Sequence, residues 1–183
     1  KNLKSFGDYK MPLYAFLAVP SVKIFGLNEF STRLPNAIFG TLAVAVIYFL
    51  CLKLKANDYR LATIASLLLA ISPWAFPLSR GAFEANLITF FLPLALVFFL
   101  RRNYSLSIIN FSLSLYSYHS SRIIIPLSIL AIFLIYRPKL NYLITKSLIL
   151  LFILSLPALY SFFFFNSRAM DVSIFHPDDG WAG

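Results

Sequence analysis

Long apolar runs separated by short polar clusters dominate the sequence. A helix needs about 20 residues to cross the roughly 30 Å hydrocarbon layer of a membrane. Apolar runs of about this length predict membrane-spanning helices at residues 34–52, 61–78, 83–100 and 143–165. Lysines and arginines flank these runs, as is typical of helix ends that reach the polar interface.

The apolar stretch at 104–136 is too long for one crossing. As a single helix rising 1.5 Å per residue it would be about 50 Å long. It is also interrupted by the polar sequence His-Ser-Ser-Arg at residues 119–122. We therefore predict two short helices, at 104–118 and 123–136, that meet at this polar apex.

A shorter apolar run at 12–27 contains Pro20 and Lys23 and has polar residues on both sides. This length and pattern predict a helix that lies in the outer membrane interface rather than across the membrane. The alternative is a slightly short membrane crossing, which would invert the sidedness of the N-terminus only.

The composition supports a membrane protein. Of the 183 residues, 60% are hydrophobic and only 13% are charged, and the mean hydropathy is +0.78. A soluble domain carries about 25% charged residues and could not bury so many apolar side chains. The composition therefore excludes a soluble fold. The single cysteine, Cys51, excludes a disulfide framework and a cysteine-based metal site.

The net charge of +9 comes from cations at the ends of apolar runs rather than from one patch, so no nucleic-acid partner is predicted. The connections 53–60, 101–103 and 137–146 contain eight lysines and arginines and a single acid, Asp58. The positive-inside rule places these connections in the cytoplasm. The acids on the opposite predicted side are Asp8, Glu29, Glu84, Asp171, Asp178 and Asp179.

These observations predict an all-α fold, a polytopic transmembrane helix bundle with an outer-face interfacial helix near the N-terminus. Residues 1–33 form the end of an extracytoplasmic loop that includes the interfacial helix. Residues 34–165 form a bundle of about six helices, and 166–183 begin another extracytoplasmic loop. Because the chain begins with Lys1 rather than methionine, we expect it to be a fragment of a longer protein.

Four stretches carry a family resemblance. Residues 7–14 read GDYKMPLY, 25–36 read FGLNEFSTRLPN, 72–86 contain SPW followed by SRGAFEAN, and 116–126 read YSYHSSRIIIP. In this order they resemble the motifs of GT-C fold membrane glycosyltransferases. The similarity is to the dolichyl-phosphate-mannose protein mannosyltransferase superfamily, whose bacterial relatives include the aminoarabinose transferases that modify lipid A.

The resemblance implies a GT-C type bundle that transfers a sugar from a polyprenyl-phosphate donor to a glycan, lipid or protein acceptor on the extracytoplasmic side. The closest motifs are bacterial, which implies the bacterial inner membrane. Met11 departs from the family by replacing the first proline of its usual pair. The family's acidic pair would lie before Lys1, so we expect the main catalytic acid to be outside this chain.

Charged residues on the predicted outer side are the candidates for donor binding. By resemblance Lys10 would contact the donor phosphate, with a lysine that binds lipid headgroups as the alternative. Arg80 and Glu84 are four residues apart and could place a guanidinium over the phosphate, or form a structural salt bridge. Glu29 and Arg33 have the same spacing, and we predict a structural role for them.

Arg122 and His119 share the predicted apex between two serine-rich half-helices, where hydroxyls tolerate membrane depth. We predict that Arg122 contacts the donor and that His119 lines the same site. A solvated loop histidine is the alternative for His119. Asp8 is the best-placed candidate for a catalytic acid or a metal ligand, with a plain loop carboxylate as the alternative.

His176, Asp178 and Asp179 form a cluster that could bind a divalent metal cofactor, although Pro177 and Gly180 are also typical of an ordinary loop. Two other functions remain open. A transporter or lipid flippase would explain broken, serine-rich helices. A structural membrane subunit would need no chemistry.

Overall fold

The computed structural model describes residues 3–5, 8–10, 12–54, 58–118, 120–136 and 149–157. Their elements are β1 (Leu3–Ser5), β2 (Asp8–Lys10), α1 (Leu13–Phe25), α2 (Glu29–Leu54), α3 (Tyr59–Ala70), α4 (Ala75–Arg80), α5 (Asn86–Leu100), α6 (Tyr104–Leu115) and α7 (Ser121–Tyr136). Residues 149–157 are also helical. The described chain is therefore helical as predicted, except for an antiparallel hairpin of β1 and β2 that the sequence analysis did not predict.

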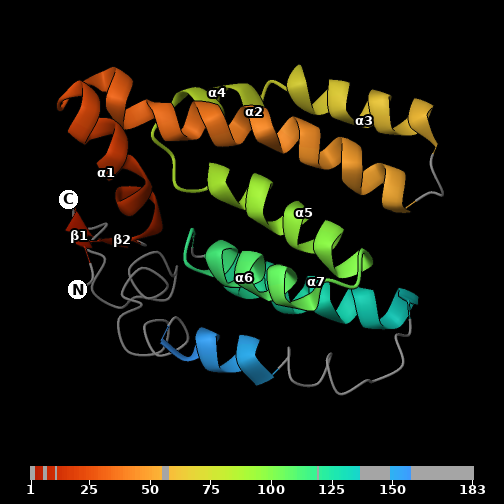
Figure 1. Ribbon diagram of the computed structural model, residues 1–183. Helices are drawn as coiled ribbons and strands as arrows, with labels where there is room; N and C mark the ends of the chain where they lie inside the picture. Colours follow the sequence, from red (N-terminus) through yellow and green to blue (C-terminus); the bar gives the residue numbers. More distant parts are fainter. Residues whose placement is uncertain are drawn as a thin grey trace, which may run out of the picture.

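The bundle contains α2, α3, α5, α6 and α7, which run side by side, and α1 lies across one of its ends (Figure 1). We call this the α1 end and the other the far end. The α2–α3 and α5–α6 connections lie at the far end, whereas the α4–α5 connection and the α6–α7 turn lie at the α1 end. Successive helices therefore alternate in direction, as the sequence analysis predicted. An interfacial position for α1 stays a prediction.

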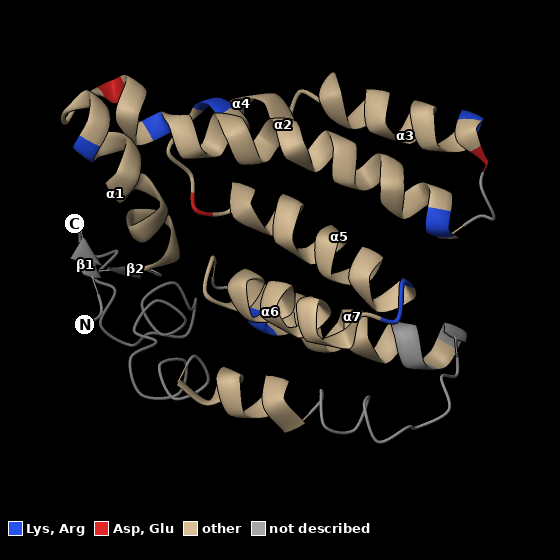
Figure 2. Ribbon diagram, in the orientation of Figure 1, with Lys and Arg blue, Asp and Glu red and all other residues tan. Residues whose placement is uncertain are grey.

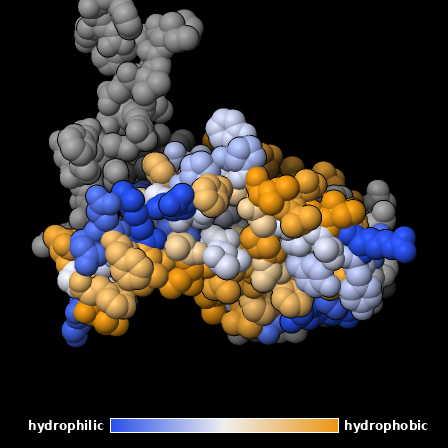
Figure 3. Space-filling model, turned by 90° about the horizontal axis from the view of Figure 1, so that it is seen from above, coloured by the Kyte–Doolittle hydropathy of each residue, from blue (hydrophilic) through white to orange (hydrophobic). Residues whose placement is uncertain are grey.

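Charged residues gather at the two ends of the bundle (Figure 2). At the far end, Asp58 caps α3 by accepting a hydrogen bond from the backbone N–H of Leu61 at 3.1 Å. The face formed by α2, α3 and α4 is mainly hydrophobic in its middle and hydrophilic toward its ends (Figure 3). Large apolar side chains are exposed there, and Trp74 is 82% exposed. Lipid rather than water suits such a surface.

The predicted crossing at 61–78 is wrong as a single helix. Instead α3 ends at Ala70 and the short helix α4 begins at Ala75. Pro73 explains the break, because proline has no N–H and disfavours a helical conformation in the residue before it. Of the described helices, α2 alone is long and apolar enough to cross a membrane, and the other apolar helices are shorter.

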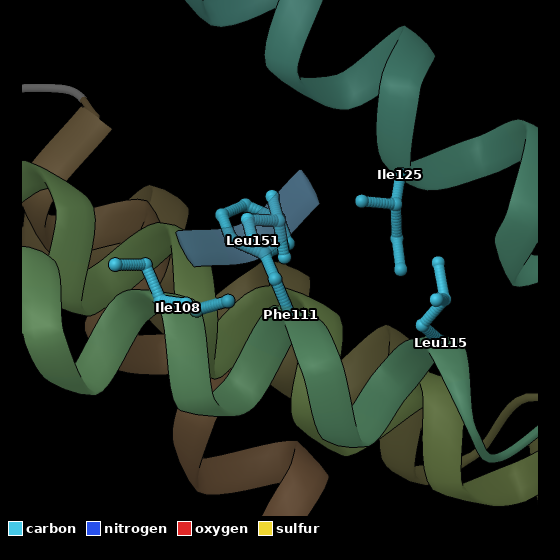
Figure 4. Close-up of a cluster of buried hydrophobic side chains, with 6 residues drawn as sticks. Ile108, Phe111, Leu115, Ile125 and Leu151 are labelled. Carbon is cyan, nitrogen blue, oxygen red and sulfur yellow. The ribbon is translucent and has the colours of Figure 1, made fainter. Parts of the chain in front are cut away.

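Helix α5 occupies the middle of the bundle and packs against α2 on one side and α6 on the other. The largest buried cluster joins α5, α6, α7 and residues 149–157 (Figure 4). It consists of Ala95, Ile108, Phe111, Leu115, Ile125 and Leu151. The hydroxyl of Tyr116 donates a hydrogen bond to the Leu154 carbonyl at 2.8 Å, which ties 149–157 to the α1 end of α6.

Candidate functional site

The α1 end carries the predicted site segments that the structure describes. Asp8 and Lys10 lie on strand β2, directly before α1. Glu84 lies in the α4–α5 connection, and Arg122 lies in the first turn of α7. His119 falls outside the described residues. The proposed metal ligands His176, Asp178 and Asp179 also fall outside them.

Arg122 is buried at the α6–α7 turn, with 8% of its surface exposed. Serines surround this turn in the sequence. Ser114, Ser117 and Ser121 are fully buried, and Ser117 donates its hydroxyl to the Ser114 carbonyl at 2.6 Å. The hydroxyls of Ser112, Ser114 and Ser121 have no hydrogen-bond partner within the described structure. Buried polar groups without partners are costly, so these hydroxyls are available to hydrogen-bond a polar ligand or a water.

The α4–α5 connection is held by Asn36 of α2, which is fully buried. The Asn36 side-chain Nδ2 donates hydrogen bonds to the carbonyls of Gly81 at 2.6 Å and Phe83 at 2.8 Å. Asn86, at the start of α5, donates its own Nδ2 to the Asn36 carbonyl at 3.1 Å. Two asparagines therefore fix the segment that carries Glu84. The sequence analysis missed this role, although an asparagine inside an apolar run signals a hydrogen-bonded polar group.

Arg80 and Glu84 do not form the predicted i,i+4 ion pair. The spacing has no helical geometry, because α4 ends at Arg80 and α5 does not begin until Asn86. The Arg80 guanidinium instead lies over the ring of Phe76, 5.1 Å from its centroid. Helix α4 packs on α2, α3 and α5, so Arg80 lies on the other side of α5 from the α6–α7 turn.

Polar contacts join α1 to the start of α2. The Tyr14 hydroxyl donates to the Thr32 carbonyl at 2.6 Å, and burial raises the pKa of Tyr14 to about 12, so the hydroxyl keeps its proton. Ser21 donates to the Ser31 carbonyl at 2.6 Å. Pro35, four residues after Ser31, has no N–H to give that carbonyl its usual helical bond. Ser21 therefore supplies the missing donor and fixes α1 to α2.

Replacing Ser21 by alanine should destabilise the protein by about 1 kcal/mol, because the buried Ser31 carbonyl loses its side-chain donor. Thermal unfolding in detergent measures the change. Adding Pro35→Ala should recover part of the loss, since alanine restores a backbone N–H. Ser128→Ala is the control, because that exposed hydroxyl bonds only to Ile124 of its own helix. Equal effects of Ser21→Ala and Ser128→Ala would contradict the role of Ser21.

The Glu29–Arg33 ion pair predicted to be structural is present, with 3.4 Å between Arg33 Nη2 and Glu29 Oε2. Both side chains are more than half exposed, at 85% for Glu29 and 54% for Arg33. Exposed pairs of this kind contribute little to stability. Arg33 is therefore an exposed cation at the α1 end, whereas Arg122 is a buried one.

A cavity of about 650 Å³ lies between α2, α3, α4 and the start of α5. It extends along α2 from Gly40 to Phe49 and is bounded on the other side by Ala70, Phe76 and Ser79. The cavity lies beside the break between α3 and α4, where the two short helices leave α2 incompletely covered.

The described bundle exposes large apolar side chains and buries serine hydroxyls without a partner at the α1 end, a combination typical of membrane proteins. Residues 9–165 match the family described as dolichyl-phosphate-mannose-protein mannosyltransferase. The chain belongs to this family, and so to the membrane glycosyltransferases of the mannosyltransferase kind. No curated protein and no solved structure matched the chain.

Proposed function

We propose that the protein transfers a sugar from a polyprenyl-phosphate donor to an acceptor on the extracytoplasmic side, and that the donor phosphate binds at the α1 end beside Arg122. The observation that carries this proposal is the burial of Arg122 next to serine hydroxyls that have no partner. A guanidinium matches the geometry of a phosphate, and hydroxyls complete its hydrogen bonding. Membership of the family supports the sugar-transfer chemistry.

The reaction requires two kinds of group at this end. The acceptor hydroxyl attacks the anomeric carbon while the bond from that carbon to the phosphate oxygen breaks. A base must take the proton of the acceptor, and cations must stabilise the leaving phosphate. Asp8 and Glu84 are the carboxylates we propose for the first need, and Lys10 joins Arg122 for the second. His119 remains a proposed member of the same site.

The proposal also covers metal binding, the class of acceptor and the membrane in which the protein lies. The described residues include no group of three or more histidine, cysteine or acidic residues placed to hold a metal ion. A divalent cation at His176, Asp178 and Asp179 therefore stays a prediction on residues outside the described structure. The acceptor is a glycan, a lipid or a protein, and the membrane is the bacterial inner membrane with the α1 end outward.

The test uses the full chain in membranes with radiolabelled polyprenyl-phosphate sugars. Arg122→Gln and Lys10→Gln should each reduce label transfer at least about tenfold, equivalent to ~1.4 kcal/mol of transition-state stabilisation. Arg33→Gln is the control, because Arg33 is an exposed cation at the same end that pairs with Glu29. Protein levels in the membrane must be equal among the variants.

Two results would contradict the proposal. If both Arg122→Gln and Lys10→Gln transfer label as well as the wild type, the donor site lies elsewhere. If the wild type transfers no sugar from any polyprenyl-phosphate donor, the transporter or flippase alternative becomes the better explanation. The broken α3–α4 segment would then be a feature of the transport path.

A further inference from the structure

We propose that the cavity between α2, α3 and α4 binds one acyl chain of an anionic phospholipid, whose headgroup is held by Arg80. The site is separate from Arg122, the proposed ligand of the donor phosphate, because α4 and the α6–α7 turn lie on different sides of α5. The proposal therefore does not depend on the proposed function.

The first argument concerns the chemistry of the cavity wall. Five hydroxyl residues line the cavity, and the four serines and threonines among them each donate a hydrogen bond to a backbone carbonyl of their own helix; the fifth is Tyr48. These bonds run from Thr41 to Ala37, Ser66 to Thr63, Ser79 to Phe76 and Thr89 to Asn86, at 2.6–3.0 Å. Their donors are therefore already used, and most of the remaining lining is aliphatic or aromatic. A hydrocarbon fits such a wall better than a sugar, because the serine and threonine donors are already used and most of the remaining side chains are apolar.

This wall contrasts with the α6–α7 turn. There the hydroxyls of Ser114 and Ser121 are buried without a partner and are available to a polar ligand. The two sites thus have opposite hydrogen-bonding character although they belong to the same bundle. The contrast supports a hydrocarbon ligand in the cavity and a phosphate-bearing ligand at the turn.

The second argument concerns size and direction. From Gly40 to Phe49 the cavity follows α2 for roughly 14 Å at 1.5 Å per residue. This is close to the hydrocarbon thickness of one leaflet, about half of 30 Å. The volume of about 650 Å³ lies within the range of single small-molecule sites. One acyl chain aligned with the helices matches both the length and the volume.

The third argument concerns charge. Arg80 follows Ser79 directly, and its guanidinium lies over the ring of Phe76, so the cation stands beside two residues that line the cavity. Arg80 is exposed and lies at the α1 end of α4. A phosphate headgroup there would be attracted to the guanidinium while its acyl chain entered the cavity. This charge selects an anionic lipid over a zwitterionic one.

The experiment measures lipid retained by the full chain. The protein is exchanged into detergent with equal phosphatidylglycerol, phosphatidylcholine and polyprenyl phosphate, and the bound lipid is identified by native mass spectrometry. We expect one retained phosphatidylglycerol per chain. Arg80→Gln should reduce this retention about fivefold, the usual contribution of one cation at a membrane surface. Arg33→Gln, at the same end of the bundle, should leave it unchanged.

A cavity-filling variant tests the acyl-chain site. Ala45→Phe places a ring in the cavity, and Leu42→Phe enlarges an exposed position of the same helix that does not line it. Ala45→Phe should abolish retention and Leu42→Phe should not. A wild-type measurement keeps the test independent of folding defects: phosphatidylglycerol with a photoreactive acyl terminus should cross-link to peptides containing 44–49 or 66–70. Retention of polyprenyl phosphate that Arg80→Gln and Ala45→Phe abolish, equal retention of both phospholipids, or cross-links confined to other helices would overturn the proposal.

Discussion

Asn36→Ala should lower the free energy of unfolding by about 1–3 kcal/mol. The Asn36 amide donates to two carbonyls of the α4–α5 connection at 2.6 and 2.8 Å, and alanine leaves both without this donor. The Phe83 carbonyl keeps a second donor, the backbone N–H of Asn86 at 3.2 Å, so the Gly81 carbonyl is the group left unpaired, at a cost of roughly 1–3 kcal/mol. Lipid cannot replace the lost bonds, because a hydrocarbon environment offers no donor.

Thermal or denaturant unfolding in detergent measures the loss, and Asn110→Ala is the matched control. Asn110 is also an asparagine buried in an apolar helix, but its Nδ2 donates to the Leu106 carbonyl of its own helix at 2.8 Å. That carbonyl belongs to a helix, where a backbone N–H four residues later also serves it. The control should lose about 1 kcal/mol or less. Equal losses for Asn36→Ala and Asn110→Ala would show that Asn36 does not hold the connection.

Gly40→Ala should destabilise the protein by about 2 kcal/mol, within the range expected for overpacking a tight contact. A Cβ at position 40 would stand 2.5 Å from Cβ of Ser79. This atom is attached directly to the backbone of α4 and cannot rotate away. Helix α4 would have to move away from α2, which would also stretch the Asn36 hydrogen bonds.

A double-mutant cycle with Ser79→Gly separates this contact from other effects of the added methyl group. In the Ser79→Gly background the obstructing Cβ is gone, so Gly40→Ala should cost less than about 0.5 kcal/mol. Unfolding of the four proteins in the same detergent gives the coupling energy. A cost that is the same in both backgrounds would contradict close packing of α2 on α4 at this point.

The order of the helices was predictable because apolar runs and their flanking cations are local features of the sequence. The prediction of helices at 104–118 and 123–136 agrees closely with α6 and α7, since the polar apex marks the turn between them. The crossing at 61–78 was predicted wrongly, because hydropathy does not detect a helix break. Pro73 was visible in the sequence, but prolines also occur within α1, α2, α5 and α7. Whether a proline ends a helix depends on the packing around it.

The site was only partly predictable. Arg122 was a candidate because a charged residue inside an apolar stretch is costly and usually functional. Spacing alone suggested an ion pair for both Arg33 and Arg80. Arg33 pairs with Glu29 because both lie within α2, whereas Glu84 lies beyond the end of α4 and Arg80 packs on Phe76 instead. An i,i+4 spacing has meaning only where the helix continues.

The sequence by itself determined that this is a membrane protein, which segments are apolar and which charges share an end of the bundle. These properties follow from composition and from the length of each apolar run. Only the tertiary structure decided that Asn36 holds the α4–α5 connection, that Ser21 serves the carbonyl left free by Pro35, and that a cavity lies beside the helix break. These contacts join residues that are many positions apart or depend on where a helix ends. Local pattern cannot specify them, because each carbonyl can accept its hydrogen bond from any donor that the fold brings within reach.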